Sequence, residues 1–415
     1  MSAKKDIVVI ADFCSNFDGK SNNRFIYIAE HLVALGHDIE IVTSDFSHGG
    51  KKPFDPKVIS YNGIKVTMLH EPPYYKNISV RRFLSHYSWG KKVYKYLKTR
   101  KKPDVVYCAI PTLKAASLAG KYCNKNGIKF IVDVQDLWPE AFRMAFNIPV
   151  ISSFLFLPFK LIANNAYKRA NEVIAVSQTY VDRAMKVNKK AKNGHSVFLG
   201  TDLAQFDKNV KETKLTNSEN ALQIVLSDEQ TFYKNKNEFW VGYCGSLSDS
   251  YDIKLVIDAI EMTNNPNVRF ICIGDGYLKE YFESYGKQKH INQLFTGKLE
   301  YSSMCQLLSC VDMVINPIKG KSAASIINKH ADYAASGKPV INTQQSEEYI
   351  KLVKDYDFGF SFNSNQIKEI ANAILTLSNN INERHRLGNN GRKCAESLFD
   401  RPKTYMIIKN LVTME

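Results

Sequence analysis

The chain has 415 residues, which is long for one hydrophobic core and sufficient for two domains. Its 44% hydrophobic and 12% aromatic residues are typical of a globular protein. No segment reaches the apolar length of a membrane span, which excludes a membrane-spanning class. The eight cysteines are scattered without metal-ligand spacing, and the first residues lead into an apolar run without a signal peptide. We therefore expect a cytoplasmic protein with free thiols.

The net charge of +15 is concentrated in one stretch. Residues 80–102 hold nine basic residues and no acidic one, interleaved with aromatic and aliphatic residues. A basic, aromatic-rich helix of this kind favours an anionic membrane surface, and a solvated cationic helix face is the simpler alternative. Nucleic acid would also suit the charge, but no recognisable nucleic-acid-binding motif accompanies it. We expect a peripheral protein at the inner face of the cell membrane that binds no nucleic acid.

The first half of the chain alternates between short apolar runs and helical patterns. The first strand, 6–13, is followed by a polar loop containing Gly19, a helix over 24–35 and a strand over 38–43. Further strands are predicted at 64–69, 105–110, 130–134, 173–176 and 196–199. This order predicts a mostly parallel sheet with helices on both faces. The apolar stretch 154–162 suits a buried helix, or a half-exposed contact with acceptor or membrane.

Acidic residues gather where the strand at 130–134 ends. Asp133, Asp136 and Glu140 lie in DVQDLWPE, which includes a Trp-Pro bend. Glu140 suits the first turn of a helix, where the helix dipole favours an acid. Asp133 and Asp136 are candidates for chemistry at the site.

The alternation stops and then restarts in the second half. Residues 206–238 are polar and predict a linker between a first domain, 1–205, and a second, 239–395. The second domain has strands predicted at 240–244, 268–273, 293–297, 313–316 and 340–342, and a helix over 253–262. Loops at 245–250 and 274–276 follow the first two of these strands. The last segment is helical, and we expect 396–415 to cross back to the first domain.

The stretch 326–341 predicts a helix that ends abruptly before a buried strand. Gly337 suits the left-handed position after a helix, and Pro339 prevents the helix from continuing. Lys329 and Asp332 are three residues apart and so share one helix face. The loop before this helix suits a phosphate, and the two side chains suit a phosphate and a ribose. An ordinary surface Lys–Asp pair is the simpler interpretation.

Taken in order, these stretches resemble glycosyltransferase family 4, whose members have the GT-B architecture of two Rossmann-like domains facing a cleft. The resemblance covers nearly the whole chain and includes the following strings: LGHDIEIVTSDF, DVQDLWPEAF, ANEVIAVSQTY, VFLGTDLAQFD, VGYCGSLS, CIGDGYLKE, FTGKLEYSSM, DMVINPIKG and NKHADYAASGKPV. It is nearest to the bacterial branch that builds capsule, O-antigen or exopolysaccharide repeats on a lipid carrier.

The resemblance implies a retaining transferase of hexosyl or N-acetylhexosaminyl groups that needs no metal and no other cofactor. The second domain would bind a nucleotide-sugar, with UDP the expected nucleotide, and the first a lipid-linked saccharide or other glycan. Lys329 would stabilise the leaving diphosphate, and Asp332 would bind the ribose. The other residues that match donor-binding positions are Gly19, Gly245, Ser246, Gly274, Gly276, Lys298, Ser325 and Ile326.

Several positions depart from the family pattern. Ala324 stands where many members have a glutamate, so sugar recognition would rest on backbone N–H groups of residues 323–326. Ser246 stands where many have an arginine, which leaves more of the phosphate charge to Lys329. Gln135 stands where several have a histidine, which makes Asp136 the candidate for assisting acceptor deprotonation. Asp355 and Asp357 have the spacing of a metal motif but lie far from the donor loops, and we give them a structural interpretation.

Two alternatives use the same fold. A nucleotide-sugar epimerase would have the same glycine-rich loops. A non-catalytic member that binds membrane or partner proteins would explain the departures at Ala324, Ser246 and Gln135.

Overall fold

The structure of the chain is a computed structural model. It describes residues 3–14, 17, 23–54, 59–76, 79–140, 156–319 and 326–414. The chain forms two compact units, of which unit 1 comprises residues 1–198 and 405–415, and unit 2 comprises residues 199–404.

Unit 1 contains an eight-stranded sheet in the order β10-β9-β8-β7-β1-β2-β6-β5. Its strand pairs are parallel, except that β5 is antiparallel to β6. The strands are β1 (Asp6–Ile10), β2 (Asp38–Ser44), β5 (Ser60–Tyr61), β6 (Ile64–Leu69), β7 (Val105–Ile110), β8 (Lys129–Val134), β9 (Glu172–Ala175) and β10 (Gly194–Ser196). A separate hairpin pairs β3 (Phe46–Ser47) with β4 (Lys52–Pro53). The alternation in the sequence therefore predicted the doubly wound sheet correctly.

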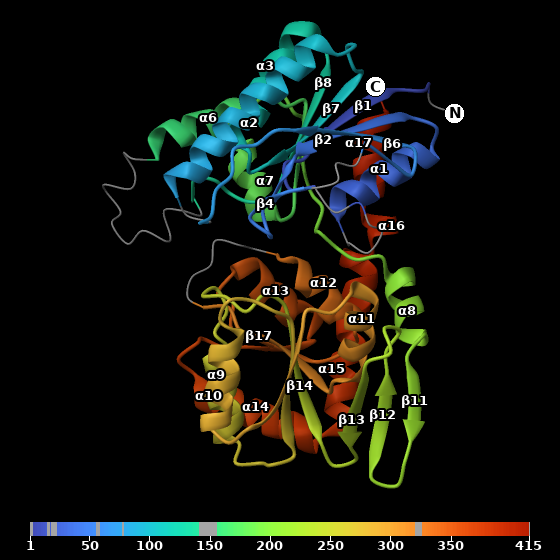
Figure 1. The fold of residues 1–415 in the computed structure, drawn as a ribbon, viewed down its shortest axis with the longest axis vertical. Coiled ribbons are helices and arrows are strands. Elements are labelled where there is room, and N and C mark those ends of the chain that lie inside the picture. The colour runs from blue at the N-terminus through green and yellow to red at the C-terminus, as the bar shows by residue number, and fades with distance from the viewer. Residues whose placement is uncertain are drawn as a thin grey trace. The chain divides into compact units, whose positions relative to one another are not determined.

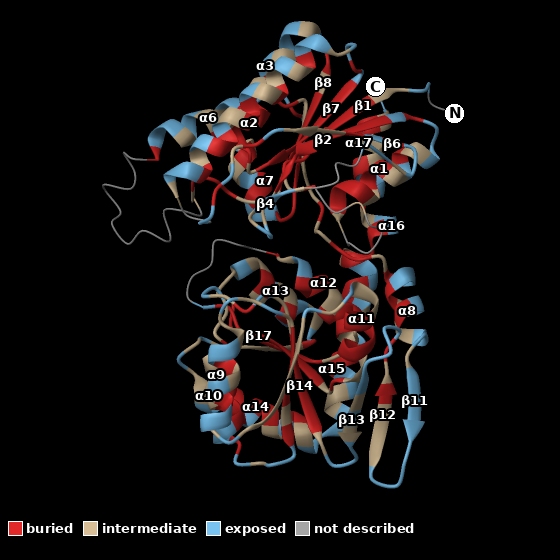
Figure 2. Ribbon diagram, in the orientation of Figure 1, coloured by how far each residue is buried: buried red, intermediate tan, exposed pale blue. Residues whose placement is uncertain are grey.

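Helices cover both faces of this sheet (Figure 1). They are α1 (Arg24–Ala34), α2 (Val80–Thr99), α3 (Leu113–Asn126), α6 (Leu157–Arg169), α7 (Gln178–Met185) and α17 (Met406–Thr413). One core cluster joins Ile7 and Val9 of β1 to α1 and to Ile408 and Val412 of α17. Successive strand residues face opposite sides, so Val8 and Ile10 are buried toward the other face. The central strands β9, β8, β7, β1 and β2 are buried almost throughout, whereas most residues of β10, β6 and β5 are half-buried or exposed (Figure 2).

Unit 2 begins with ordered structure where the sequence predicted a polar linker. Helix α8 (Leu203–Lys211) is followed by an antiparallel sheet of β11 (Lys214–Asn217), β12 (Ala221–Val225) and β13 (Thr231–Asn235). The strands were missed because β11 is exposed along its length and only Ile224 of β12 is buried, so the segment lacks the apolar pattern of a core strand. Gln306 holds this sheet to the unit, since its side chain accepts a hydrogen bond from the Ser227 N–H at 2.8 Å.

A six-stranded parallel sheet forms the centre of unit 2, in the order β16-β15-β14-β17-β18-β19. Its strands are β14 (Phe239–Cys244), β15 (Val268–Ile273), β16 (Asn292–Gly297), β17 (Met313–Asn316), β18 (Val340–Asn342) and β19 (Gly359–Ser361). The helices are α9 (Ile253–Met262), α10 (Lys279–Gln288), α11 (Tyr301–Cys310), α12 (Asn328–Ala335), α13 (Glu347–Tyr356), α14 (Ile367–Asn379) and α15 (Ile381–Cys394). Gly337 follows α12 with φ of +64°, as its position in the sequence predicted.

The end of the chain is helical but interrupted. A π-helical turn, η1 (Ala395–Phe399), and a short helix, α16 (Arg401–Thr404), separate α15 from α17. The residues from Tyr405 onward belong to unit 1, where Tyr405 receives a hydrogen bond from Arg24 at 3.0 Å. Within the described residues, none of the helices has the length and apolar character needed to cross a membrane.

Candidate functional site

A pocket in unit 2 opens at the carboxyl ends of β14, β15 and β16, which are neighbours in the sheet. Its volume is about 270 Å³. It is lined by Cys244, Gly245, Ser246, Ile273, Gly274, Asp275, Lys298, Leu299 and Met304. Open parallel sheets bind ligands at this edge, because the loops leaving the strands meet there. Four of the predicted donor-binding residues therefore lie together: Gly245, Ser246, Gly274 and Lys298.

Gly245 and Gly274 let the first two loops touch. Their φ values are +147° and +154°, a region that side chains rarely adopt. A Cβ on Gly274 would lie 1.9 Å from the Gly245 carbonyl oxygen. The Gly245 N–H donates to the Ile273 carbonyl at 2.9 Å, which fixes the contact. Gly276 has a packing role, because a Cβ there would lie 2.2 Å from the Leu247 oxygen, and it does not contribute to the described lining of the pocket.

Lys329 lies directly behind the floor of this pocket. A Cβ on Gly245 would be 2.6 Å from its Nζ. The side chain is buried, and Nζ has no hydrogen-bond partner among the residues the structure describes. The ammonium instead lies 4.2 Å from the ring centre of Tyr243 and 3.8 Å from that of Tyr251, which are cation–π distances. Burial lowers the pKa of Lys329 to about 7.

Among the described residues, Lys329 is thus a buried basic group without a matching anion. Burial of an unpaired charge is unfavourable, and an anion entering the pocket next to Gly245 would supply the missing partner. Sequence patterns did not reveal the two tyrosines, because Tyr243 reads as a core residue of β14 and Tyr251 as a loop residue. Their grouping around Lys329 depends on the fold.

Asp332 lies one helical turn from Lys329 on α12 and is hydrogen-bonded. The Tyr301 hydroxyl donates to Asp332 Oδ1 at 2.8 Å, and the same hydroxyl is 2.5 Å from Thr201 Oγ1. Burial raises the pKa of Asp332 to about 6, although the bond from Tyr301 opposes this. Asp332 does not contribute to the described lining of the pocket. Its predicted contact with a ribose therefore remains a prediction.

Three further predicted residues belong to the loops. Ile326 is buried just before α12 and does not contribute to the described lining of the pocket. Gly19 and Ser325 lie outside the described residues, as do Ala323 and Ala324. The predictions for the sugar-binding backbone therefore stay predictions.

In unit 1, the acidic residues after β8 have separate roles. Asp133 is fully buried and accepts hydrogen bonds from Arg24 at 2.8 Å and from Gln135 at 2.6 Å. This network anchors α1 to the sheet, so the structure assigns Asp133 a structural role. Asp136 is half-buried and accepts a bond from Trp138 Nε1 at 3.0 Å. Burial raises the pKa of Asp136, which suits a group that takes up a proton.

The Asp355 and Asp357 pair has surface ion-pair partners. Asp355 pairs with Lys351 at 3.1 Å, and Asp357 pairs with Arg386 at the end of α13. This agrees with the structural interpretation of the motif.

Two family models match the sequence. One, described as glycosyltransferase family 4, matches residues 21–205, and the other, glycosyl transferases group 1, matches residues 227–394. No curated protein sequence matches the chain significantly.

Solved structures similar to this chain are GT-B glycosyltransferases. HepE of Anabaena in complex with UDP has a TM-score of 0.68 at 18% identity and covers 98% of each chain. Sucrose-phosphate synthase of Thermosynechococcus elongatus has a TM-score of 0.70 at 14% identity and also covers 98% of each chain. WaaG, a glycosyltransferase of lipopolysaccharide biosynthesis, has a TM-score of 0.64 at 13% identity, with coverage of 99% of this chain and 100% of WaaG.

The two doubly wound units have the GT-B fold, and the family models identify the chain as a glycosyltransferase. The two family matches lie one on each half of the chain and together span most of it. The first half of the chain is thus similar to glycosyltransferase family 4, and the second half to glycosyl transferases group 1.

Proposed function

We propose that this protein transfers a sugar from a UDP-sugar to a lipid-linked saccharide, with retention of the anomeric configuration and without a metal ion. The main support for a nucleotide-sugar donor is the buried amino group of Lys329, which lies behind Gly245 of the pocket. A diphosphate is the part of a nucleotide-sugar that needs such a cation, since negative charge develops on it as the sugar leaves. HepE binds UDP and UDP-glucose, and it has the same fold.

The base would lie along the loop at Lys298, with Gly245 and Gly274 letting the diphosphate approach the backbone. Both glycines lack side chains where the loops meet, so a phosphate could approach the backbone closely there. Asp332 would accept hydrogen bonds from the ribose hydroxyls, a role that suits a carboxylate. Asp136 in unit 1 would assist removal of the acceptor proton.

Unit 1 also presents a surface suited to a membrane. Val80 and Leu84 of α2 are 74% and 64% exposed, and Leu157 and Leu161 of α6 are 46% and 54% exposed. The two helices meet through Phe83 and Phe159, whose ring centres are 4.7 Å apart. Exposed basic residues continue along α2 and just beyond it: Arg81, Lys91, Lys95, Lys98, Lys101 and Lys102. Apolar side chains beside such cations favour an anionic membrane, where a lipid-linked acceptor would be located.

Not all of the basic stretch takes part in this surface. Arg82 is buried, and Arg100 pairs with Asp6 at 2.8 Å and Glu40 at 3.0 Å. The membrane surface proposed here therefore comprises the exposed residues named above, rather than all of 80–102.

Transfer is tested with the purified chain, radiolabelled UDP- and GDP-sugars, and lipid extract. We expect one UDP-sugar to label a lipid-extractable product, with activity unchanged by a chelator. Lys329→Ala should lose at least tenfold in kcat/KM. Conversion of the sugar without acceptor would instead support an epimerase, and failure to bind any nucleotide would support a non-catalytic protein.

A further inference from the structure

Two tyrosine rings contact the buried amino group of Lys329, and neither has a role in the chemistry proposed above. Lys329 Nζ lies 3.8 Å from the ring centre of Tyr251 and 4.2 Å from that of Tyr243. The two rings meet edge to face, with their centres 5.7 Å apart and their planes at 62°. Because the face of an aromatic ring attracts a cation, both rings stabilise the charged form of this lysine.

The positions of the two rings are set by the loop after β14. Tyr243 is a fully buried residue of β14, and its hydroxyl donates to the Ser246 carbonyl at 2.7 Å. Tyr251 lies at the other end of this loop, where its N–H donates to the Ser248 carbonyl at 3.1 Å and its backbone pairs with Ile318. Ser246 lines the donor pocket. The loop that forms part of the pocket wall therefore also places the rings around the lysine.

Gly245 keeps the space in front of the amino group free of side-chain atoms. A Cβ at this position would lie 2.6 Å from Lys329 Nζ and 3.0 Å from the Tyr243 hydroxyl oxygen. Gly245 itself lines the pocket. A side chain there would separate the lysine from a bound anion, whereas the glycine lets the two approach.

An aromatic ring differs from a carboxylate, the usual partner of a buried lysine, in what it does to the charge. A carboxylate neutralises an ammonium group, whereas a ring stabilises it and leaves the positive charge uncancelled. Asp332 lies on the same helix, but its Oδ1 accepts a hydrogen bond from Tyr301 at 2.8 Å. Lys329 Nζ has no hydrogen-bond partner in the part of the chain that the structure describes. Its charge is thus available to a ligand.

We propose that Tyr243 and Tyr251 are positioning residues whose rings hold the charged amino group of Lys329 behind Gly245, where it meets the diphosphate of the donor. This inference rests on the proposed function, because it explains how that donor site keeps a cation ready without a carboxylate partner. Ser246 brings no charge to the pocket wall, so the charged state of Lys329 matters for binding.

The charged fraction of Lys329 is sensitive to its surroundings near neutral pH. Burial lowers the pKa of Lys329 to about 7, so loss of a ring that stabilises the ammonium should lower this pKa further. Burial raises the pKa of the Cys244 thiol to about 12 and raises that of Cys272 as well. Burial also lowers the pKa of His330 well below its usual value. These three groups therefore keep their charge between pH 6 and pH 8.

Other ionisable groups near the lysine need a comparison between variants. Burial raises the pKa of Asp332 to about 6, so this carboxyl does change its charge in the same range, but every variant compared below retains it. Burial raises the pKa of both tyrosines, which stay neutral. The charged side chains that line the pocket are those of Asp275 and Lys298, and they too are retained.

The test measures the affinity of the full chain for UDP-glucose by calorimetry at two pH values. At pH 8 we expect Tyr251→Leu to bind at least threefold more weakly than the wild type, because less of Lys329 is charged. At pH 6 the same variant should come within twofold of the wild type, since the lysine then binds a proton with or without the ring. Tyr251→Phe keeps the ring face and should stay within twofold at both pH values.

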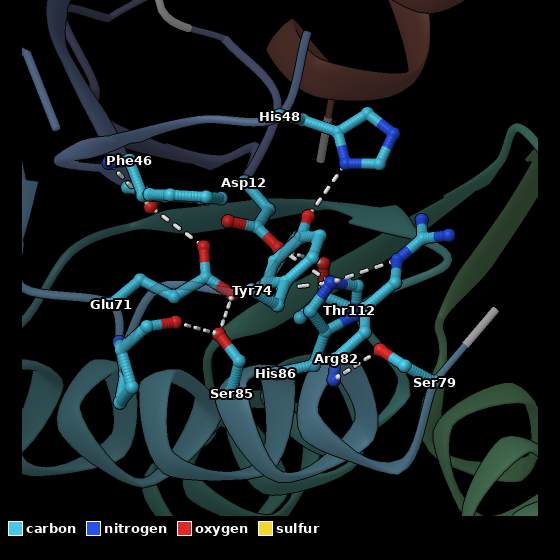
Figure 3. Close-up of polar contacts among 12 residues, drawn as sticks. Asp12, Phe46, His48, Glu71, Tyr74, Ser79, Arg82, Ser85, His86 and Thr112 are labelled. Atoms are coloured by element: carbon cyan, nitrogen blue, oxygen red, sulfur yellow. Dashed lines mark hydrogen bonds and ion pairs between the residues drawn. The ribbon is translucent and has the colours of Figure 1, made fainter. Parts of the chain in front are cut away.

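A cluster around Tyr74 in unit 1 provides the matched control. Tyr74 is fully buried and also lies near cations, with Lys51 Nζ 4.9 Å and the Arg82 guanidinium carbon 5.8 Å from its ring centre. Its hydroxyl is 2.6 Å from His48 Nδ1 (Figure 3). Tyr74→Leu therefore removes a buried ring of the same kind from the unit that does not contain the donor pocket. Its affinity for UDP-glucose should stay within twofold of the wild type at both pH values.

A fluorinated ring separates attraction of the cation from packing. Phenylalanine with three fluorine atoms, introduced at position 251, has nearly the shape of phenylalanine, but its ring face is less negative. Its affinity at pH 8 should lie between those of Tyr251→Phe and Tyr251→Leu. Equal affinity of the fluorinated and the ordinary phenylalanine variants would show that the ring acts through packing alone, which would overturn the proposal.

The charge of Lys329 can also be followed without a donor, by an NMR titration of ¹³C-labelled lysines in which Lys329→Met identifies the signal. Its pKa should fall in Tyr251→Leu and stay unchanged in Tyr74→Leu. A chain that binds no UDP-glucose would contradict the proposed donor, and this titration would still decide the role of the rings. The inference fails if the pKa of Lys329 is the same in Tyr251→Leu. It also fails if the weaker binding at pH 8 persists at pH 6 or occurs equally in Tyr74→Leu.

Discussion

At the scale of single residues, Lys329 combines a cost in stability with a role in binding. Its amino group is buried with no hydrogen-bond partner in the part of the chain that the structure describes, and burial lowers its pKa to about 7. In the unfolded chain its pKa returns to that of a free lysine, about 10.4, so the unfolded state binds more protons between these values. The lysine therefore destabilises the folded protein most fully below pH 7, and the cost disappears as the pH rises to about 10.4.

We predict that Lys329→Met stabilises the protein without ligand at pH 7, by on the order of 2 kcal/mol, because an apolar side chain replaces an unpaired charge. The gain should shrink steadily as the pH approaches 10. Urea unfolding of both proteins at several pH values measures it. Although the variant is expected to be more stable, it should bind UDP at least tenfold more weakly than the wild type. A variant less stable than the wild type at pH 7 would contradict the unpaired state of Lys329.

A second prediction concerns how pH affects donor binding. An anion near Lys329 raises its pKa, so binding takes up a proton when the free lysine is neutral. UDP-glucose suits the test because its diphosphate neither gains nor loses a proton near neutral pH, so its own charge stays constant. Its affinity should fall as the pH rises from about 7 toward 9, by up to tenfold per pH unit. Calorimetry should find a pH-independent affinity in Lys329→Ala, whereas Lys298→Ala, at the exposed side of the pocket, should keep the wild-type slope.

At the scale of elements, the pocket depends on the contact between the loops after β14 and β15. We predict that Gly274→Ala weakens UDP binding at least tenfold, because its Cβ would collide with the Gly245 carbonyl oxygen and φ is +154°. The control is Gly127→Ala after α3. Gly127 has φ of +62°, but a Cβ at this position would meet no atom within 4 Å, so only the conformational cost of about 1 kcal/mol applies. Measuring the stability and the UDP affinity of both variants distinguishes the steric collision from the conformational cost. Normal UDP binding by Gly274→Ala would show that the two loops can move apart, which would contradict the prediction.

Strands and their order were predictable because each is a short apolar run between polar turns. The sequence predicted β6, β7, β15 and β17 with the same bounds as the structure. It failed for β11–β13, where exposed residues alternate without an apolar face. Hydrogen bonding between adjacent strands stabilises such a sheet, and composition does not reveal that pairing.

The site was predictable only in part, because residues at strand ends can be located from the sequence whereas contacts between distant segments cannot. Gly245, Ser246, Gly274 and Lys298 follow directly from strand ends, so the sequence located them and the structure brings them together. Lys329 was predicted on a helix face, but its cage of Tyr243 and Tyr251 required the fold. The cluster around Tyr74 was missed for the same reason. His48 and Arg82 are distant in sequence, and Arg82 was counted among the surface charges of its helix.

At the scale of the whole molecule, the excess of positive charge and the exposed apolar side chains of α2 and α6 serve one purpose in our proposal. The net charge of +15 attracts the chain to anionic lipid, and this long-range attraction weakens as salt screens it. Leu84 and Leu161 then enter the interface, where each contributes on the order of 1 kcal/mol, since part of each side chain is already covered by protein.

We therefore predict that the protein binds vesicles containing phosphatidylglycerol, less so at high salt, and binds phosphatidylcholine vesicles weakly. The double variant Leu84→Ser, Leu161→Ser should lose roughly tenfold or more in vesicle affinity at fixed salt, from about 1 kcal/mol at each position. Leu215→Ser is the matched control, because Leu215 is 55% exposed on β11 of unit 2. Co-sedimentation with vesicles measures all three proteins. If Leu215→Ser weakened binding as much as the double variant does, apolar exposure in general would account for the association, and the surface on α2 and α6 would have no special role.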